Sequence, residues 1–183
     1  MIEFPVVTIL SAFLELLTSP IGPPLVLAFG ALLVWQIGQR TANIELTGTA
    51  AFVFWLIAAI QTIGLRMQPV VPIYSRPWQP VILPGFNLLW VGDGWNWYVS
   101  VLILLLGGVT ILLSIFVGGN PKAESTTGIV HQITATLTAN LAVLATALLF
   151  VGSGNLLTVI MTWVVMDLFI LARNALAPPS LEL

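Results

Sequence analysis

The chain has 183 residues, of which 58% are hydrophobic and only 7% are charged, and its formal net charge is −2. A soluble domain of this size needs far more polar surface than five basic and seven acidic side chains can supply. The charge balance gives no sign of nucleic-acid binding. With no cysteine and one histidine, the composition excludes a disulfide framework, a thiolate nucleophile and a multi-histidine metal site.

Several apolar runs of about 18 to 22 residues are each long enough to cross the ~30 Å hydrocarbon core of a bilayer as a helix. They predict an all-α, polytopic membrane helix bundle that forms one integral domain over residues 1–183. The expected spans are about 21–38, 48–65, 96–117, 133–151 and 154–174.

The first apolar segment, residues 4–19, is shorter than these spans and contains Glu15. At ~1.5 Å per residue it reaches about 24 Å as a helix, which is less than a comfortable span. Two interpretations stay open: an interfacial or partly inserted helix with Glu15 facing water, or an extra spanning helix. The acidic start, MIEF, lacks the basic character of a cleavable signal peptide.

Residues 66–95, here called the Pro/Trp-rich loop, differ from the spans because repeated prolines prevent a regular helix. Aromatic residues, which favour the membrane interface, surround these prolines. We expect a loop lying against the membrane surface, with the tryptophans as interfacial anchors. The residues concerned are Pro69, Pro72, Pro77, Pro80, Pro84, Tyr74, Trp78, Trp90, Trp95, Trp97 and Tyr98.

The placement of basic residues predicts an orientation. With five spans, Arg40, Lys122 and Arg173 fall on one side of the membrane, and Arg66 and Arg76 fall on the other. Cytoplasmic loops carry an excess of Lys and Arg, so the first side is weakly favoured as cytoplasmic. The Pro/Trp-rich loop then faces outward.

Asp167, near the middle of the expected span 154–174, is the strongest candidate for function. Membrane interiors hold ionisable groups at a cost, and usually for a functional reason. The carboxyl group either belongs to a proton pathway, or forms a structural link to a neighbouring Thr or Asn or to a partner subunit. Arg173 is a poor partner within the helix because it lies about 240° further around the axis.

Other polar or small residues have weaker claims. His131, expected before the fourth span at the membrane surface, is a proton relay, a cofactor ligand or simply a solvated residue. Asp93 is expected to cap the third span. Gly107 and Gly108 are expected to let helices approach closely, and Gln61 is expected to form an interhelical hydrogen bond.

The segment FNLLWVGDG, residues 86–94, resembles the start of the third helix in the antiporter-like subunits of respiratory complex I and of Mrp-type cation/proton antiporters. Asn140-Leu141, the apolar run to Asn155-Leu156-Leu157, and then Trp163 are similar to the fourth and fifth helices of that family. The resemblance covers about half of the chain, from Phe86 to about Asn174. It implies a membrane subunit of a proton- or sodium-translocating complex, expected in the bacterial inner (plasma) membrane.

Two departures from the family pattern stand out. The family's key glutamate would directly follow Trp163, where this chain has Val164. Asp167 comes three residues later, about 4.5 Å along a helix and about 60° around it. In addition, the chain ends after the fifth span, before the broken helix that carries the family's conserved lysine. These departures predict the N-terminal part of an antiporter-like subunit, truncated or split.

On this interpretation the protein is a non-catalytic, scaffold-like subunit of a translocase complex, with Asp167 and His131 as proton-pathway candidates. Trp163 and Asp93 have structural roles. The expected partners are lipid and other integral membrane subunits, among them a chain that supplies the missing helices. No cofactor, metal or nucleic acid is expected. The alternative is a structural or assembly subunit of another energy-converting membrane complex, without an ion pathway of its own.

Overall fold

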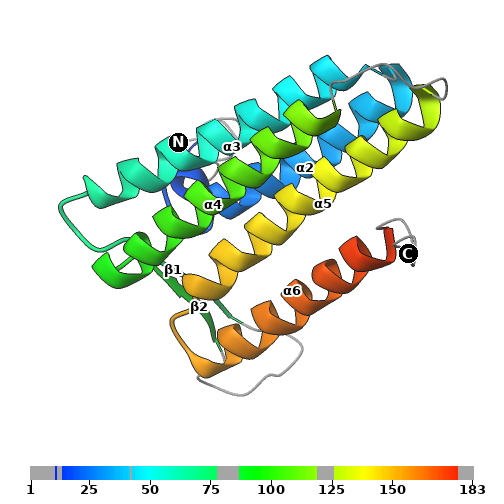
Figure 1. Cartoon of the computed structure of the whole chain (residues 1–183). Helices are drawn as coiled ribbons and strands as arrows, with labels where there is room; N and C mark the ends of the chain where they lie inside the picture. Colours follow the sequence, from blue (N-terminus) through cyan, green and yellow to red (C-terminus); the bar gives the residue numbers. More distant parts are fainter. Residues whose placement is uncertain (1–10, 12–13, 42, 78–86, 119–125, 177–183) are drawn as a thin grey trace, which may run out of the picture.

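The computed structural model describes residues 11, 14–41, 43–77, 87–118 and 126–176. Within them, five long helices confirm the predicted all-α membrane bundle (Figure 1). A small two-stranded sheet lies at one end of the bundle. Trp78, Lys122 and most of the N-terminal segment 4–19 lie outside the described residues. The elements are α2 (Gly22–Thr41), α3 (Ile44–Arg66), β1 (Ile73–Pro77), β2 (Asn87–Val91), α4 (Gly94–Gly118), α5 (Thr126–Val151) and α6 (Leu156–Leu176).

Each of the five helices is long and apolar enough to cross a membrane. Their lengths run from 20 residues in α2 to 26 residues in α5. At ~1.5 Å per residue these helices reach about 30 to 39 Å, which matches a hydrocarbon core of ~30 Å. The protein is therefore an integral, multi-pass membrane protein.

Two helices extend beyond their apolar runs. The polar link expected between the first two spans is almost entirely helical, because α2 continues to Thr41 and α3 begins at Ile44. Asn43 caps α3, its Oδ1 accepting the Leu46 N–H at 3.1 Å. Likewise α5 begins at Thr126, seven residues before the expected start of its span. Polar residues in the sequence mark where a helix leaves the membrane and meets water. A capped helix can continue beyond that point.

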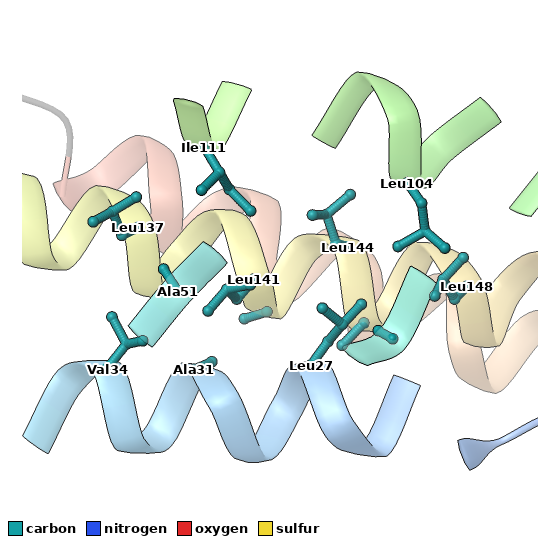
Figure 2. Close-up of a cluster of buried hydrophobic side chains, with 13 residues drawn as sticks. Leu27, Ala31, Val34, Ala51, Leu104, Ile111, Leu137, Leu141, Leu144 and Leu148 are labelled. Atoms are coloured by element: carbon teal, nitrogen blue, oxygen red, sulfur yellow. The ribbon is translucent and has the colours of Figure 1, made fainter. Parts of the chain in front are cut away.

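The core lies where α5 packs against α2, α3 and α4 (Figure 2). Leu27 and Val34 of α2 and Ile111 of α4 are fully buried against α5. Lipid is as apolar as leucine, so helices in a membrane associate through close packing and hydrogen bonds. The buried residues that α5 contributes to the cluster are Leu137, Leu141, Ala142, Leu144, Ala145 and Leu148.

Small residues make that packing close, as expected for Gly107 and Gly108. A Cβ atom on Gly107 would overlap the Leu144 side chain of α5, and one on Gly108 would overlap the Trp55 ring of α3. The two adjacent glycines thus let α4 touch both neighbours at once.

Two tryptophans link α3 to α4 through their indole N–H groups. Trp55 Nε1 donates to the Leu104 carbonyl at 2.8 Å, and Trp97 Nε1 donates to the Thr62 carbonyl at 2.9 Å. Trp97 is thus a half-buried link between helices and not only an interfacial anchor. Trp95, by contrast, is 73% exposed, as an anchor should be.

The Pro/Trp-rich loop contains a structure that the sequence did not indicate. β1 and β2 pair as an antiparallel hairpin, with Ile73 opposite Val91 and Pro77 opposite Asn87. Pro77 is compatible with a strand here because it is the last residue of β1, on the outer edge of the sheet. The expected loop therefore has no helix at these ten residues, and they form a β-hairpin that the sequence analysis did not predict.

The other edge of β2 pairs with the turn between α5 and α6. The Val91 N–H donates to the Gly152 carbonyl at 2.8 Å, and the Gly154 N–H donates to the Leu89 carbonyl at 2.7 Å. The hairpin therefore joins the end of α5 and the start of α6 to one end of the bundle.

Candidate functional site

The first turns of α6 are held by a cluster of polar side chains, here called the α6 anchor: Asn155, Thr158, Ser153 and Thr162. Asn155 Oδ1 accepts from both the backbone N–H and the hydroxyl of Thr158, at 2.9 and 2.8 Å. The Asn155 amide donates to the Asn87 carbonyl at 2.7 Å. Asn155 therefore caps α6 and ties it to β2 in one step.

Two more bonds complete the α6 anchor. Thr158 Oγ1 accepts the Leu89 N–H of β2 at 2.8 Å, so one buried hydroxyl serves both the sheet and the cap. Ser153 Oγ and Thr162 Oγ1 lie 3.0 Å apart. The sequence carries a signal for this anchor. An Asn with Thr residues three and seven positions after it is typical of a capped helix with one polar face.

Beyond Trp163, α6 is only loosely packed against the rest of the bundle. Every residue from Asp167 to Asn174 is exposed. In the apolar part of α6 that could span a membrane, 11% of the residues are buried. The corresponding share in α5 is 44%. Figure 1 shows the C-terminal half of α6 standing apart from α2 to α5. The helix is fixed at one end of the bundle and unpacked at the other.

An apolar cavity of about 360 Å³ lies between α6 and the bundle. Val165 and Phe169 line it from α6, and Ala31 and Ala142 line it from α2 and α5. Even the side of α6 that faces the bundle is therefore incompletely packed in this half of the helix.

Asp167 lies in this unpacked half. It is 11 residues after the start of α6 and nine before its end, so it sits about 16 Å and 13 Å from the two ends. This places the carboxyl group near the middle of a helix that is long enough to span a bilayer. It is exposed and makes no hydrogen bond or ion pair with any described residue. Among the described residues, no Thr or Asn forms the structural hydrogen bond that was one of the expectations for Asp167.

Helix geometry shows which way Asp167 faces. Thr158, fully buried in the α6 anchor, is nine residues before it, and nine residues turn an α-helix by about 180°. Asp167 thus lies on the side of α6 opposite to the packed one. The exposed residues that share this side, here called the Asp167 face, are Ile160, Trp163, Val164, Asp167, Leu171 and Asn174.

The Asp167 face also contains Val164, the position at which the resemblance noted from the sequence implies a glutamate. Val164 is 54% exposed on this face. The neighbouring Trp163 is equally exposed and packs edge-on against Phe150 of α5, with ring centroids 6.4 Å apart. Val164 and Asp167 therefore point to the same outer surface.

His131 is not brought near Asp167. It lies inside α5 and not before it, and its side chain is exposed. Because α5 and α6 run antiparallel from the turn at 152–154, His131 lies about 12 Å further from that turn than Asp167 does. His131 was expected just before the fourth span, and it is instead the second residue of the candidate span Val130–Val151, at its end. The described residues contain no cluster of His, Asp and Glu that could hold a metal ion.

Asp93 sits at the start of α4, at the end of the bundle that carries the sheet. Its Oδ1 accepts the Asn96 N–H at 2.8 Å, which is the geometry of a helix N-cap. On the same end, Arg76 donates to the Tyr74 hydroxyl at 2.7 Å, and this bond raises the pKa of the Arg76 guanidinium.

Gln61 does not form the interhelical hydrogen bond expected of it. Its Oε1 is buried and has no partner among the described residues. It lines a separate apolar cavity beside α2 and α3.

Comparisons with protein-family models, with curated proteins and with solved structures find no match for this chain.

Proposed function

We propose that this protein is a membrane subunit of a multi-subunit complex that translocates protons or sodium ions, and that Asp167 is its contribution to the ion pathway. The observation that carries this proposal is the exposed carboxyl group in the middle of α6, without a partner among the described residues. Ionisable side chains at membrane depth are costly, and they commonly mark ion pathways and proton relays.

The resemblance to antiporter-like subunits supports the same function. It implies an acid in the fifth spanning helix, and α6 is the fifth helix in the bundle that can span a membrane. Asp167 stands one turn from the family's position, on the same outer face as Val164. The complex is proposed to reside in the bacterial inner membrane.

The geometry favours a subunit over a transporter that works alone. A proton relay needs several ionisable groups in sequence, whereas among the described residues of the spanning helices Asp167 stands without a second such group in contact. The four helices α2 to α5 form the packed part of the bundle, and α6 carries the acid away from them. The remaining groups of the pathway would then belong to other subunits.

The substitution Asp167→Asn tests this function, because it removes the ionisable proton and nearly preserves the size of the side chain. In membrane vesicles from the native host, we expect it to abolish most of the ion translocation while the complex still assembles. Asp93→Asn is the matched control: the same chemical change at a helix cap, where Asn caps as well as Asp. Full translocation by the Asp167→Asn complex would overturn the proposal.

A second function is favoured by one observation, the presence of Val164 where the antiporter-like family has its glutamate. The protein would then be a structural or assembly subunit without an ion pathway. This alternative predicts normal translocation by Asp167→Asn, and loss of the whole complex when the chain is deleted.

A further inference from the structure

The cavity beside α2 and α3 that Gln61 lines, here called the Gln61 cavity, is large enough to hold a small molecule. Its volume is about 510 Å³, within the usual range of ligand sites. Two of the residues that line it are partly exposed on the outside of the bundle, Phe29 at 57% and Ile57 at 40%. The cavity therefore opens toward the surrounding lipid.

Three parts of the chain form the walls of the Gln61 cavity. Two walls belong to α2 and α3, whose Phe29 and Phe54 rings meet edge to face with centroids 6.1 Å apart. Residues 16–17, both leucines, contribute the third. Their segment is attached beyond the end of α3, because Gln68 Nε2 donates to the Thr18 carbonyl at 3.0 Å. Packed and hydrogen-bonded parts of the fold thus build the cavity.

Gln61 supplies the polar group of the cavity, and this group lacks a partner. Its Oε1 atom is buried and accepts no hydrogen bond from any described residue. A buried amide oxygen without a donor is unfavourable, and at membrane depth there is no bulk water to replace the missing bond. The other described residues that line the cavity are all apolar, so none of their side chains can supply the donor.

The polar and apolar parts of the cavity lie at different depths. Gln61 is five residues before Arg66, the last residue of α3, which is about 7.5 Å along the helix. Phe54 is seven residues before Gln61 and therefore about 10 Å deeper. The cavity has a hydrogen-bonding group toward the membrane surface and apolar walls toward the membrane centre, which is the polarity of a lipid molecule.

We propose that the Gln61 cavity binds a neutral lipid with a hydroxyl head group and a hydrocarbon tail, such as a glyceride or a long-chain alcohol. The hydroxyl group donates to Gln61 Oε1, and the tail lies along Ile57 toward the Phe54 ring. A hydroxyl group suits an amide because it both donates and accepts hydrogen bonds.

The lining also selects against other occupants. A charged head group does not fit, since no described residue that lines the cavity is charged and a buried unpaired charge is strongly unfavourable. A plain hydrocarbon chain would leave the Gln61 oxygen without a donor. No described residue of α6 lines the cavity, so this site is independent of Asp167 and of the proposed function.

Two photoreactive probes test the site in membranes from cells that express the full chain. One is a long-chain alcohol with a diazirine in its tail and a terminal alkyne. The other is its methyl ether, which is matched in shape but cannot donate a hydrogen bond. After irradiation, mass spectrometry measures the labelling of each residue. Phe116 on α4, which is 76% exposed, reports the background from bulk lipid.

On the unaltered chain, we expect the alcohol to label Ile57 and Phe54 about fivefold more strongly than the ether does, which corresponds to one hydrogen bond of ordinary strength. An excess of unlabelled alcohol should remove this difference, and Phe116 should be labelled equally by both probes. Equal labelling of the cavity by the alcohol and the ether would overturn the proposal, and this comparison requires no variant.

Two substitutions locate the head group and the tail. Gln61→Leu should lower labelling by the alcohol to the level of the ether, and it replaces an unpartnered amide by an apolar group of similar size. Ile57→Trp fills the cavity and should remove the specific labelling, although Gln61 is unchanged. An advantage of the alcohol that survives Gln61→Leu would contradict the hydrogen bond to this residue.

Lipids extracted from the purified chain identify the natural occupant. Mass spectrometry distinguishes a glyceride from a long-chain alcohol, and whichever is bound should be depleted about fivefold or more in Gln61→Leu preparations. A neutral hydroxyl lipid that is equally abundant with both chains, or enrichment confined to phospholipids, would refute the site.

Discussion

Thr158 and Asp167 lie on opposite faces of α6, nine residues apart, and this relationship sets the two roles of the helix. Thr158 is fully buried and accepts the Leu89 N–H at 2.8 Å, so it holds the helix to the sheet. Asp167 is exposed on the outer side, two and a half turns later. One end of α6 is therefore a fixed support, and its middle presents a carboxyl group away from the bundle.

Removing the Thr158 hydroxyl should weaken that support. Thr158→Val keeps the shape of the side chain but leaves the Leu89 N–H without its acceptor and removes a donor to Asn155. We expect a loss of about 1 kcal/mol in the free energy of unfolding, measured by denaturant titration of the purified chain in micelles. Thr136→Val is the control, because the exposed Thr136 hydroxyl bonds only to the Gln132 carbonyl in its own helix. Equal effects of the two substitutions would contradict the anchoring role of Thr158.

Asp167 itself should contribute nothing to the stability of the isolated chain. Its carboxyl group has no partner among the described residues, so Asp167→Leu should change the free energy of unfolding in micelles by no more than about 0.5 kcal/mol. The same substitution in the native membrane should reduce the amount of assembled complex, measured by native gel electrophoresis. A large destabilisation of the isolated chain would show that Asp167 has an internal partner.

The paired glycines of α4 offer a test of the bundle core. Gly108→Ala places a Cβ against the Trp55 ring of α3, where the neighbours leave no room. Overpacking of this kind costs about 1 to 3 kcal/mol. Gly64→Ala in α3 is the control, since nothing lies within 4 Å of its Cβ position. There the helix preference for alanine should leave stability unchanged or raise it by up to about 1 kcal/mol, and thermal unfolding in detergent distinguishes the two.

Trp97 should matter more than Trp95, although the two residues are nearly adjacent. Trp97→Phe removes the indole donor and leaves the Thr62 carbonyl without this bond, at an expected cost of about 1 kcal/mol. Trp95→Phe removes the indole N–H of a side chain that is 73% exposed, and the expected change is within about 0.5 kcal/mol. Unfolding monitored by circular dichroism at fixed detergent concentration would compare them, and a reversed order would exclude the proposed link between α3 and α4.

Several local features follow from the sequence alone. Apolar runs of this length can cross a bilayer only as helices, because a lipid-exposed backbone must satisfy its own hydrogen bonds. The five helices of the structure accordingly fall on the five predicted spans. Asp93 at the start of α4 could be assigned to capping for a similar reason, since a carboxylate before a helix has backbone N–H groups within reach.

The hairpin could not be predicted in the same way. Ile73 pairs with Val91 across a segment that includes several prolines, and β2 gains its second neighbour only when the turn after α5 folds against it. The pairing joins residues distant in sequence, so no local pattern specifies it. Hydropathy also does not predict that α5 extends back to Thr126. The loss of apolar residues at the membrane surface does not by itself end a helix.

The amino-acid sequence by itself determined that α6 spans the membrane and that it carries one acid near its middle. The direction of that acid was decided only by the tertiary structure. In a membrane protein both the packed face and the lipid-facing face of a helix are apolar, so hydrophobic periodicity cannot distinguish them. Asp167 faces outward because the α6 anchor, formed with the distant residues Asn87 and Leu89, fixes the rotation of the helix about its axis.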